Sequence, residues 1–105
     1  MILIHIVPQQ NSAADEIVDL LVEKKLILNA MIHENIRIRQ KSKEGKIENI
    51  RRTLVVGKTK ALLFNIIDEL LREKYGNEMP VLYSIPIVHM DWEQAEELME
   101  ETEKV

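Results

Sequence analysis

Residues 26–58, LILNAMIHENIRIRQKSKEGKIENIRRTLVVGK, decide the fold of this chain. Apolar and polar residues alternate through residues 26–41, which is typical of a strand with one buried face. The polar segment SKEG then predicts a turn, because it ends in a glycine that accepts a left-handed backbone. A second strand is expected over residues 46–58, and the change of apolar parity between Ile47 and Ile50 predicts a bulge in it. The stretch is therefore expected to form a long β-hairpin.

Two elements are expected before the hairpin. Ile2–Val7 is an uninterrupted apolar run closed by a proline, which is typical of a strand buried on both faces. Asn11 and Ser12 then offer a cap for a helix with acidic residues in its first turn. The apolar residues of this helix follow at helical spacing, namely Ile17, Leu20 and Leu21.

Three elements are expected after the hairpin. Thr59 is placed to cap a second helix. That helix is expected to end at Gly76, because glycine commonly follows the last turn of a helix. A strand is expected over Val81–Val88. Asp91 and Gln94 then predict a capping box for a last, acidic helix. The second helix has an apolar stripe formed by Leu63, Ile66, Ile67, Leu70 and Leu71.

The order of elements is β-α-β, β-α-β and a final helix, which is the split βαβ arrangement. We therefore predict an α+β fold, a ferredoxin-like βαβ-βαβ sandwich with a four-stranded antiparallel sheet and an extra C-terminal helix, in a single domain over residues 1–105. Right-handed crossovers place both main helices on one face of the sheet. The strand Ile2–Val7 is apolar on both sides, so the other face is expected to pack against another subunit.

Composition sets the remaining limits. Of the 105 residues, 46% are apolar and 30% are charged, as expected of an ordered domain, and the net charge of -4 is too mild to imply a partner. The absence of cysteine excludes disulfides, thiol catalysis and thiolate metal sites. No stretch approaches the roughly 18 apolar residues of a membrane-spanning helix, and the first residues lack the basic start of a signal peptide. A cytoplasmic protein is therefore expected.

Three short motifs carry a resemblance to a known family. Glu44-Gly45-Lys46-Ile47 fits a hairpin signature with an acidic-glycine-lysine turn, Glu78-x-Pro80 fits the second half of a His-Pro-Tyr-Glu-x-Pro motif, and Ser84-Ile85-Pro86-Ile87 is similar to an Ala-Leu-Pro-Val strand. In these motifs, and in the order and length of its elements, the chain resembles the CutA family of divalent-cation-tolerance proteins. These are ferredoxin-like trimers related in architecture to the PII signalling proteins.

The chain departs from the family pattern at other positions. Ser42 and Lys43 stand where tryptophans are expected, Tyr75-Gly76-Asn77 stands in place of His-Pro-Tyr, and the usual cysteine of the second strand falls at about Asn29. The matched residues mainly specify the fold, whereas the lost ones are those most often linked to a site. The chain thus resembles a divergent member of the family, and the resemblance implies a homotrimer with a binding or regulatory role related to divalent metal ion tolerance.

The candidate ligand-binding residues are expected at a contact between subunits. Lys46 and Glu78 belong to the matched family motifs. Lys58, Thr59 and Lys60 follow a strand and open a helix, whose N-terminus is suited to an anion. The glycine that a phosphate-binding loop needs upstream is missing, so a nucleotide-binding P-loop is rejected. These residues leave an alternative function open, a PII-like sensor of a small anionic ligand or nucleotide.

Catalytic and metal-binding patterns are weak. No serine-histidine-acid pattern and no paired carboxylates in a plausible cleft stand out, so an enzyme is not expected; an intersubunit active site around Lys46 and Glu78 ranks last, because two residues define no mechanism. His5, His33 and His89 are the only soft metal ligands, and no two of them have chelating spacing. We expect no resident cofactor and weak divalent metal binding at most.

A basic run extends from Arg37 to Lys60, with Glu44 and Glu48 as its only opposing charges. Such a run suits nucleic acid or a phosphorylated ligand, but no aromatic residue interleaves with it for base stacking. No specific nucleic acid partner is therefore expected. The interpretation we favour is a solvated arm that meets the acidic C-terminal helix of a neighbouring subunit.

Overall fold

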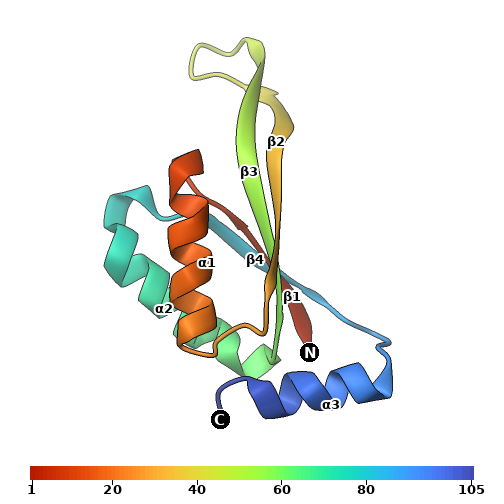
Figure 1. Cartoon of the computed structure of the whole chain (residues 1–105). Coiled ribbons are helices and arrows are strands. Elements are labelled where there is room, and N and C mark those ends of the chain that lie inside the picture. Colours follow the sequence, from red (N-terminus) through yellow and green to blue (C-terminus); the bar gives the residue numbers. More distant parts are fainter.

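A four-stranded antiparallel sheet carries two helices on one of its faces (Figure 1). The computed structural model describes all 105 residues of the chain. The sheet strands and helices, in chain order, are β1 (Ile2–Val7), α1 (Ala14–Glu23), β2 (Ala30–Lys41), β3 (Ile47–Thr59), α2 (Phe64–Tyr75), β4 (Val81–Pro86) and α3 (Trp92–Glu101). Short 3-10 turns cover Asn11–Ala13, Ala61–Leu63 and Gly76–Glu78. None of the helices is long and apolar enough to cross a membrane.

The strand order β2-β3-β1-β4 confirms the predicted ferredoxin-like α+β fold. Every pair of neighbouring strands is antiparallel, and β1 lies between β3 and β4, with Ile4 opposite Gly57 on one side and Ser84 on the other. β1 is a central strand, and the helices cover one of its two faces. Burial against the helices explains the apolar residues on that face. The other side of the strand is considered below.

The core lies between the sheet and the pair α1 and α2. Ile2, Ile4 and Ile6 point toward the helices and are almost fully buried. The helices contribute the fully buried Ile17, Leu21, Ile67 and Leu71, and the 3-10 turn before α2 adds the fully buried Leu63. These are the positions of the apolar stripes read from the sequence, so burial of each side chain stabilises the fold by about 1.5–3 kcal/mol. The apolar residues of the two helices and of one sheet face therefore form a single core.

The predicted start of the second strand is wrong by four residues. The strand β2 begins at Ala30, whereas residues 26–29 form a loop that turns under the sheet after Lys25 at a φ of 58°. Leu26 and Ile27 are apolar because they are buried in the core, and not because they belong to a strand. Gly57 accommodates this loop, since a Cβ atom at that position would lie 3.3 Å from Ile27 Cδ1.

The predicted bulge exists, but it lies in the other strand of the hairpin. The register between β2 and β3 shifts between His33 and Ile36, where Asn35 has a φ of 59°. Asparagine tolerates this left-handed backbone better than most residues. The parity change read in β3 has a different cause: Ile47 is 62% exposed near the hairpin turn and does not belong to the apolar side of the strand.

Two of the predicted helix caps are also wrong. The side chain of Asn11 accepts a hydrogen bond from Thr53 N and does not cap α1, and Thr59 Oγ1 donates to Leu26 O and does not cap α2. Both helices begin instead through 3-10 turns. The cap at Asp91 is confirmed, because its Oδ2 accepts from Gln94 N at 3.2 Å, and Gly76 ends α2 as predicted.

The last strand ends two residues earlier than predicted. β4 ends at Pro86, which pairs with Ile2 at the start of β1, so no partner strand remains for the residues beyond it. Ile87 N still donates to Met1 O at 3.0 Å. The chain then leaves the sheet toward α3.

The two ends of the molecule differ in character. The hairpin of β2 and β3 extends well past the other strands, and α3 lies at the opposite end of a chain measuring 48 × 29 × 19 Å (Figure 1). α3 is held by the buried Leu98 and by Lys60, whose Nζ donates to Thr102 O at 3.3 Å and to Glu103 O at 2.8 Å. α3 therefore closes one end of the fold and does not cover the second sheet face.

Candidate functional site

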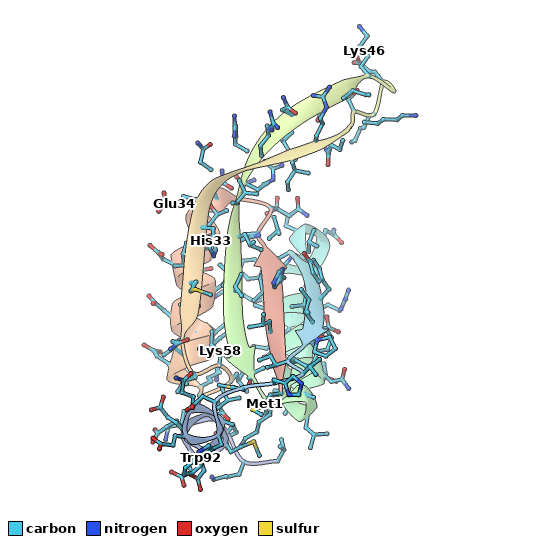
Figure 2. The ribbon with its side chains drawn as sticks, turned by 90° about the vertical axis from the view of Figure 1, so that its right-hand side faces the viewer. Met1, His33, Glu34, Lys46, Lys58 and Trp92 are labelled. Carbon is cyan, nitrogen blue, oxygen red and sulfur yellow. The ribbon has the colours of Figure 1, made fainter.

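The sheet face opposite α1 and α2, called the open face below, is not covered by any element of this chain (Figure 2). Residues that pair across neighbouring strands share a face. The register therefore assigns to the open face Leu3, His5 and Val7 of β1, Met31 and His33 of β2, Leu54, Val56 and Lys58 of β3, and Val81, Tyr83 and Ile85 of β4. Val81 is 50% exposed and Tyr83 is 46% exposed. A contiguous apolar face of this kind is unusual on a monomer.

Beyond the bulge the hairpin projects as an arm, residues 34–52, with two different sides. Its apolar side carries Ile36, Ile38 and Ile50, which share a face with Arg52. A hollow of about 150 Å³ joins this side to the open face, lined by Val7, Ile36, Ile38, Arg52, Thr53, Leu54 and Tyr83. The basic side of the arm carries Arg37, Arg39, Lys41 and Arg51. The apolar side thus continues the open face, whereas the basic side points away from it.

A polar pair lies within the open face. His5 Nδ1 is 3.2 Å from Tyr83 Oη, and the two rings are 5.1 Å apart between centroids. The pair joins β1 to β4, since the two residues are direct cross-strand partners. It gives this largely apolar face, which also carries His33 and Lys58, one fixed polar contact that a partner surface has to match.

The five predicted ligand-binding residues do not come together within one chain. Lys46 lies at the tip of the arm, and Lys58 lies toward the opposite end of the sheet (Figure 2). Glu78 lies in the 3-10 turn after α2, beside a small cavity of about 30 Å³ that Tyr75 also lines. A shared site for these residues would require more than one subunit, and both that site and their ligand-binding role stay predictions.

Thr59 and Lys60 already have partners inside the chain. Thr59 is fully buried and its Oγ1 donates to Leu26 O at 2.5 Å, while Lys60 is 7% exposed and binds the backbone of the C-terminal segment. The 3-10 turn Ala61–Leu63 separates both residues from α2. Their positions are explained by the fold, so an anion at this point would have to displace existing hydrogen bonds.

Sequence reasoning missed a polar cluster at the end of α2. Tyr75 Oη donates to Glu16 Oε1 at 2.6 Å, and Lys74 Nζ lies 3.8 Å from the same oxygen. Burial, together with the hydrogen bond to the Glu16 carboxylate and its charge, raises the pKa of Tyr75 above its ordinary value. No local spacing signals this contact, because Glu16 lies on α1 and the two residues are 59 positions apart.

The structure places the three histidines apart from any carboxylate cluster. His5 and His33 lie on the open face and His89 lies in the segment between β4 and α3. No group of three or more histidine, aspartate or glutamate side chains lies together in a way that could hold a metal ion. The residues of one chain therefore do not fit a resident metal centre.

Sequence comparison alone finds no relatives: no family model matches the chain, and no curated protein matches it. Solved structures do match over the whole chain. CutA from Pyrococcus horikoshii superposes with a TM-score of 0.85 and 25% identity, covering 98% of this chain and 100% of that one. The chain is CutA-like. CutA from Archaeoglobus fulgidus, described as a periplasmic divalent cation tolerance protein, gives a TM-score of 0.84 at 25% identity, again over 98% and 100% of the chains.

The CutA-like fold extends to more distant structures. CutA1 from Oryza sativa superposes with a TM-score of 0.86 at 19% identity, covering 99% of this chain and 94% of that one. The resemblance drawn from the turn and strand motifs is thus confirmed. Ser42, at a position where the resemblance implies a tryptophan, organises the turn of the CutA-like arm, because its Oγ accepts from Glu44 N and Lys46 N at 3.3 Å each.

Proposed function

We propose that this CutA-like chain is a homotrimer with a binding or regulatory role related to divalent metal ion tolerance. The observation that carries the proposal is the superposition on CutA proteins over 98% of the chain, in a molecule whose second sheet face is left uncovered. The described role of those proteins supports the same role here, and the uncovered face supports the assembly. We favour a binding role over catalysis, because the matched proteins are described as divalent cation tolerance proteins.

The assembly follows from the open face. Burial of apolar surface is worth about 25 cal/mol per Å², and a stable interface buries about 800 Å² on each partner. The open face and the apolar side of the arm form one continuous surface through the hollow beside Val7 and Tyr83. A neighbouring subunit that packs there covers both. Burial of this apolar surface requires an oligomer but does not set the number of subunits. The number three comes from the likeness to CutA.

The ligand site belongs to the contact between subunits. Lys46, Lys58 and Glu78 are separate within one chain and meet only if neighbouring copies bring the arm tip of one near the body of another. Thr59 and Lys60 join the same proposed site less readily, since both hold backbone oxygens of their own chain. We place the protein in the cytoplasm, a location that cell fractionation tests.

A thermal-unfolding screen tests the proposed role. A ligand of the native state raises the apparent stability, by about 2.7 kcal/mol at a hundred times its Kd. Divalent copper, zinc and manganese at millimolar concentration are expected to raise the midpoint, with magnesium as a hard-ion comparison and a chelator as the control. A nucleotide that raises the midpoint when no divalent metal does would contradict the metal-related role and favour the small-anion sensor.

A further inference from the structure

The basic side of the arm brings three arginines together. Arg37 and Arg51 are direct cross-strand partners, and Arg39 lies two residues further along the same side, opposite Asn49. Directly opposed residues on one face of an antiparallel pair have Cβ atoms about 5 Å apart. All three arginines are exposed. The arm thus holds three guanidinium groups on one side of a two-stranded ribbon.

No carboxylate of the chain neutralises this cluster. The ion pairs of the molecule join Arg72 to Asp68 and Lys74 to Glu16, and neither includes a residue of the arm. Arg39 Nη1 donates to Asn49 Oδ1 at 3.1 Å, and Arg51 Nη1 donates to Asn35 O at 3.5 Å, so both retain free donors. Like charges directly opposite each other destabilise a sheet. An anion bound between Arg37 and Arg51 would relieve that repulsion.

The carboxylates of the arm lie elsewhere on it. Glu34 lies at its base, Glu44 lies in the terminal turn, and Glu48 pairs with Gln40 on the apolar side. The acidic residues of α3 lie at the far end of a molecule 48 Å long, so they do not reach the arm of the same chain. Asp15 and Glu34 line a hollow at the base of the arm, and neither forms an ion pair with the three arginines. The counter-charge for the arginines is therefore left to another molecule.

We propose that Arg37, Arg39 and Arg51 form a binding site for a compact polyphosphate anion of the inorganic triphosphate type. Guanidinium groups present paired donors that match phosphate oxygens, and charge-assisted hydrogen bonds of this kind are about twice as strong as neutral ones. The arm carries no aromatic side chain on which a base could stack, so the phosphate groups carry the recognition.

This inference goes beyond the proposed function and does not depend on it. The proposed subunit interface uses the open face and the apolar side of the arm, whereas the arginines occupy the opposite side. They are exposed in the single chain, and a neighbour that packs only on the open face and the apolar side of the arm would not cover them. If the anion does not bind, the proposed assembly is unaffected. If the chain does not assemble, the three arginines are still exposed on each arm.

Calorimetric titration of the full chain with inorganic triphosphate tests the site. We expect saturable binding at low salt, with an affinity that falls as salt rises, and a loss of about tenfold or more in R37A/R51A. The matched control K24A/K104A removes the same number of positive charges from exposed positions outside the arm and is expected to change the affinity by less than about threefold. R37K/R51K keeps the charge but loses the paired donors, and it is expected to bind more weakly than the original chain.

Three results would overturn the site. The first is the absence of saturable binding. The second is an equal loss of affinity in R37A/R51A and K24A/K104A, which would show that the overall charge, and not a defined site, attracts the anion. The third is tighter binding of a single-stranded oligonucleotide than of triphosphate at equal phosphate concentration, which would assign the arm to nucleic acid. Light scattering on each variant reads the oligomeric state separately, and a changed state in R37A/R51A would move these arginines into the subunit contact and contradict the proposal.

Discussion

His5 and Tyr83 face each other across β1 and β4, with His5 Nδ1 3.2 Å from Tyr83 Oη, on a sheet face that no other part of the chain covers. The pair sits among apolar neighbours that extend without a break onto one side of the arm. Polar groups that become buried need hydrogen-bond partners, and this pair supplies one bond, between His5 Nδ1 and Tyr83 Oη. A subunit that buries the open face is then expected to offer a partner for His5 Nε2.

Substitution Y75F is expected to reduce stability near neutral pH by about 1 kcal/mol, because the hydrogen bond from Tyr75 Oη to the partly exposed Glu16 carboxylate is lost. The raised pKa of Tyr75 in the folded chain means that the neutral form is favoured by folding. Its contribution is therefore complete below the unfolded value of about 10 and is lost as the pH rises above it.

Urea unfolding of both chains at pH 7 and in the alkaline range measures this difference. The gap between the original chain and Y75F should shrink as the pH rises above about 10. A gap that stays constant or widens with pH would contradict the assigned proton donor.

Substitution K60M is expected to destabilise the chain by about 1–3 kcal/mol, since the carbonyl groups of the buried Thr102 and of the partly covered Glu103 lose their donor. Protection of the C-terminal segment in amide hydrogen exchange should fall with it. K24M, which removes an exposed lysine at the end of α1, serves as the control and should change stability by less than about 0.5 kcal/mol.

If K60M and K24M are equally stable, the hydrogen bonds of Lys60 do not stabilise the fold, and Lys60 is available to bind the predicted ligand. This substitution therefore separates the structural role of Lys60 from the ligand-binding role that the sequence suggested.

Metal binding is expected to be weak for each chain, because no cysteine is present and no three potential ligands lie together. Calorimetric titration with copper(II) and zinc should show dissociation constants weaker than about micromolar, which corresponds to roughly 8 kcal/mol. H5A and H33A show whether any binding observed comes from the open face. A stoichiometric site tighter than about micromolar would contradict this expectation, whichever residues form it.

The sequence predicted the element order because periodicity reports which side of a strand or helix is buried. The apolar run Ile2–Val7 and the helical stripe around Ile67 and Leu71 both reappear as core. The predicted turn also holds, because Gly45 has a φ of 83°. These features depend on neighbours in the chain, and local patterns therefore suffice for them.

The features that the sequence did not predict depend on distant contacts. The sequence pattern of Leu26 and Ile27 is that of strand residues. Their position in a loop depends on contacts with Thr59, which binds Leu26 O, and with Gly57, which lies against Ile27. Thr59 itself reads as a helix cap, although its hydroxyl binds a backbone oxygen 33 positions away. The pairing of Arg37 with Arg51 depends on a register that the bulge at Asn35 sets. The sequence showed the basic run, but only the strand register shows which of its charges lie on the same side of the arm.

Light scattering coupled to gel filtration, at micromolar concentration, tests the central claim that the open face joins subunits. The original chain should elute with three times its 12.3 kDa mass. I85E, which places a charge on the open face, should lower that mass, whereas L62E, at a site 73% exposed and away from the sheet, should not. A dimer would contradict only the number taken from the CutA likeness. A stable monomer of the original chain would contradict the claim that the open face is a subunit interface.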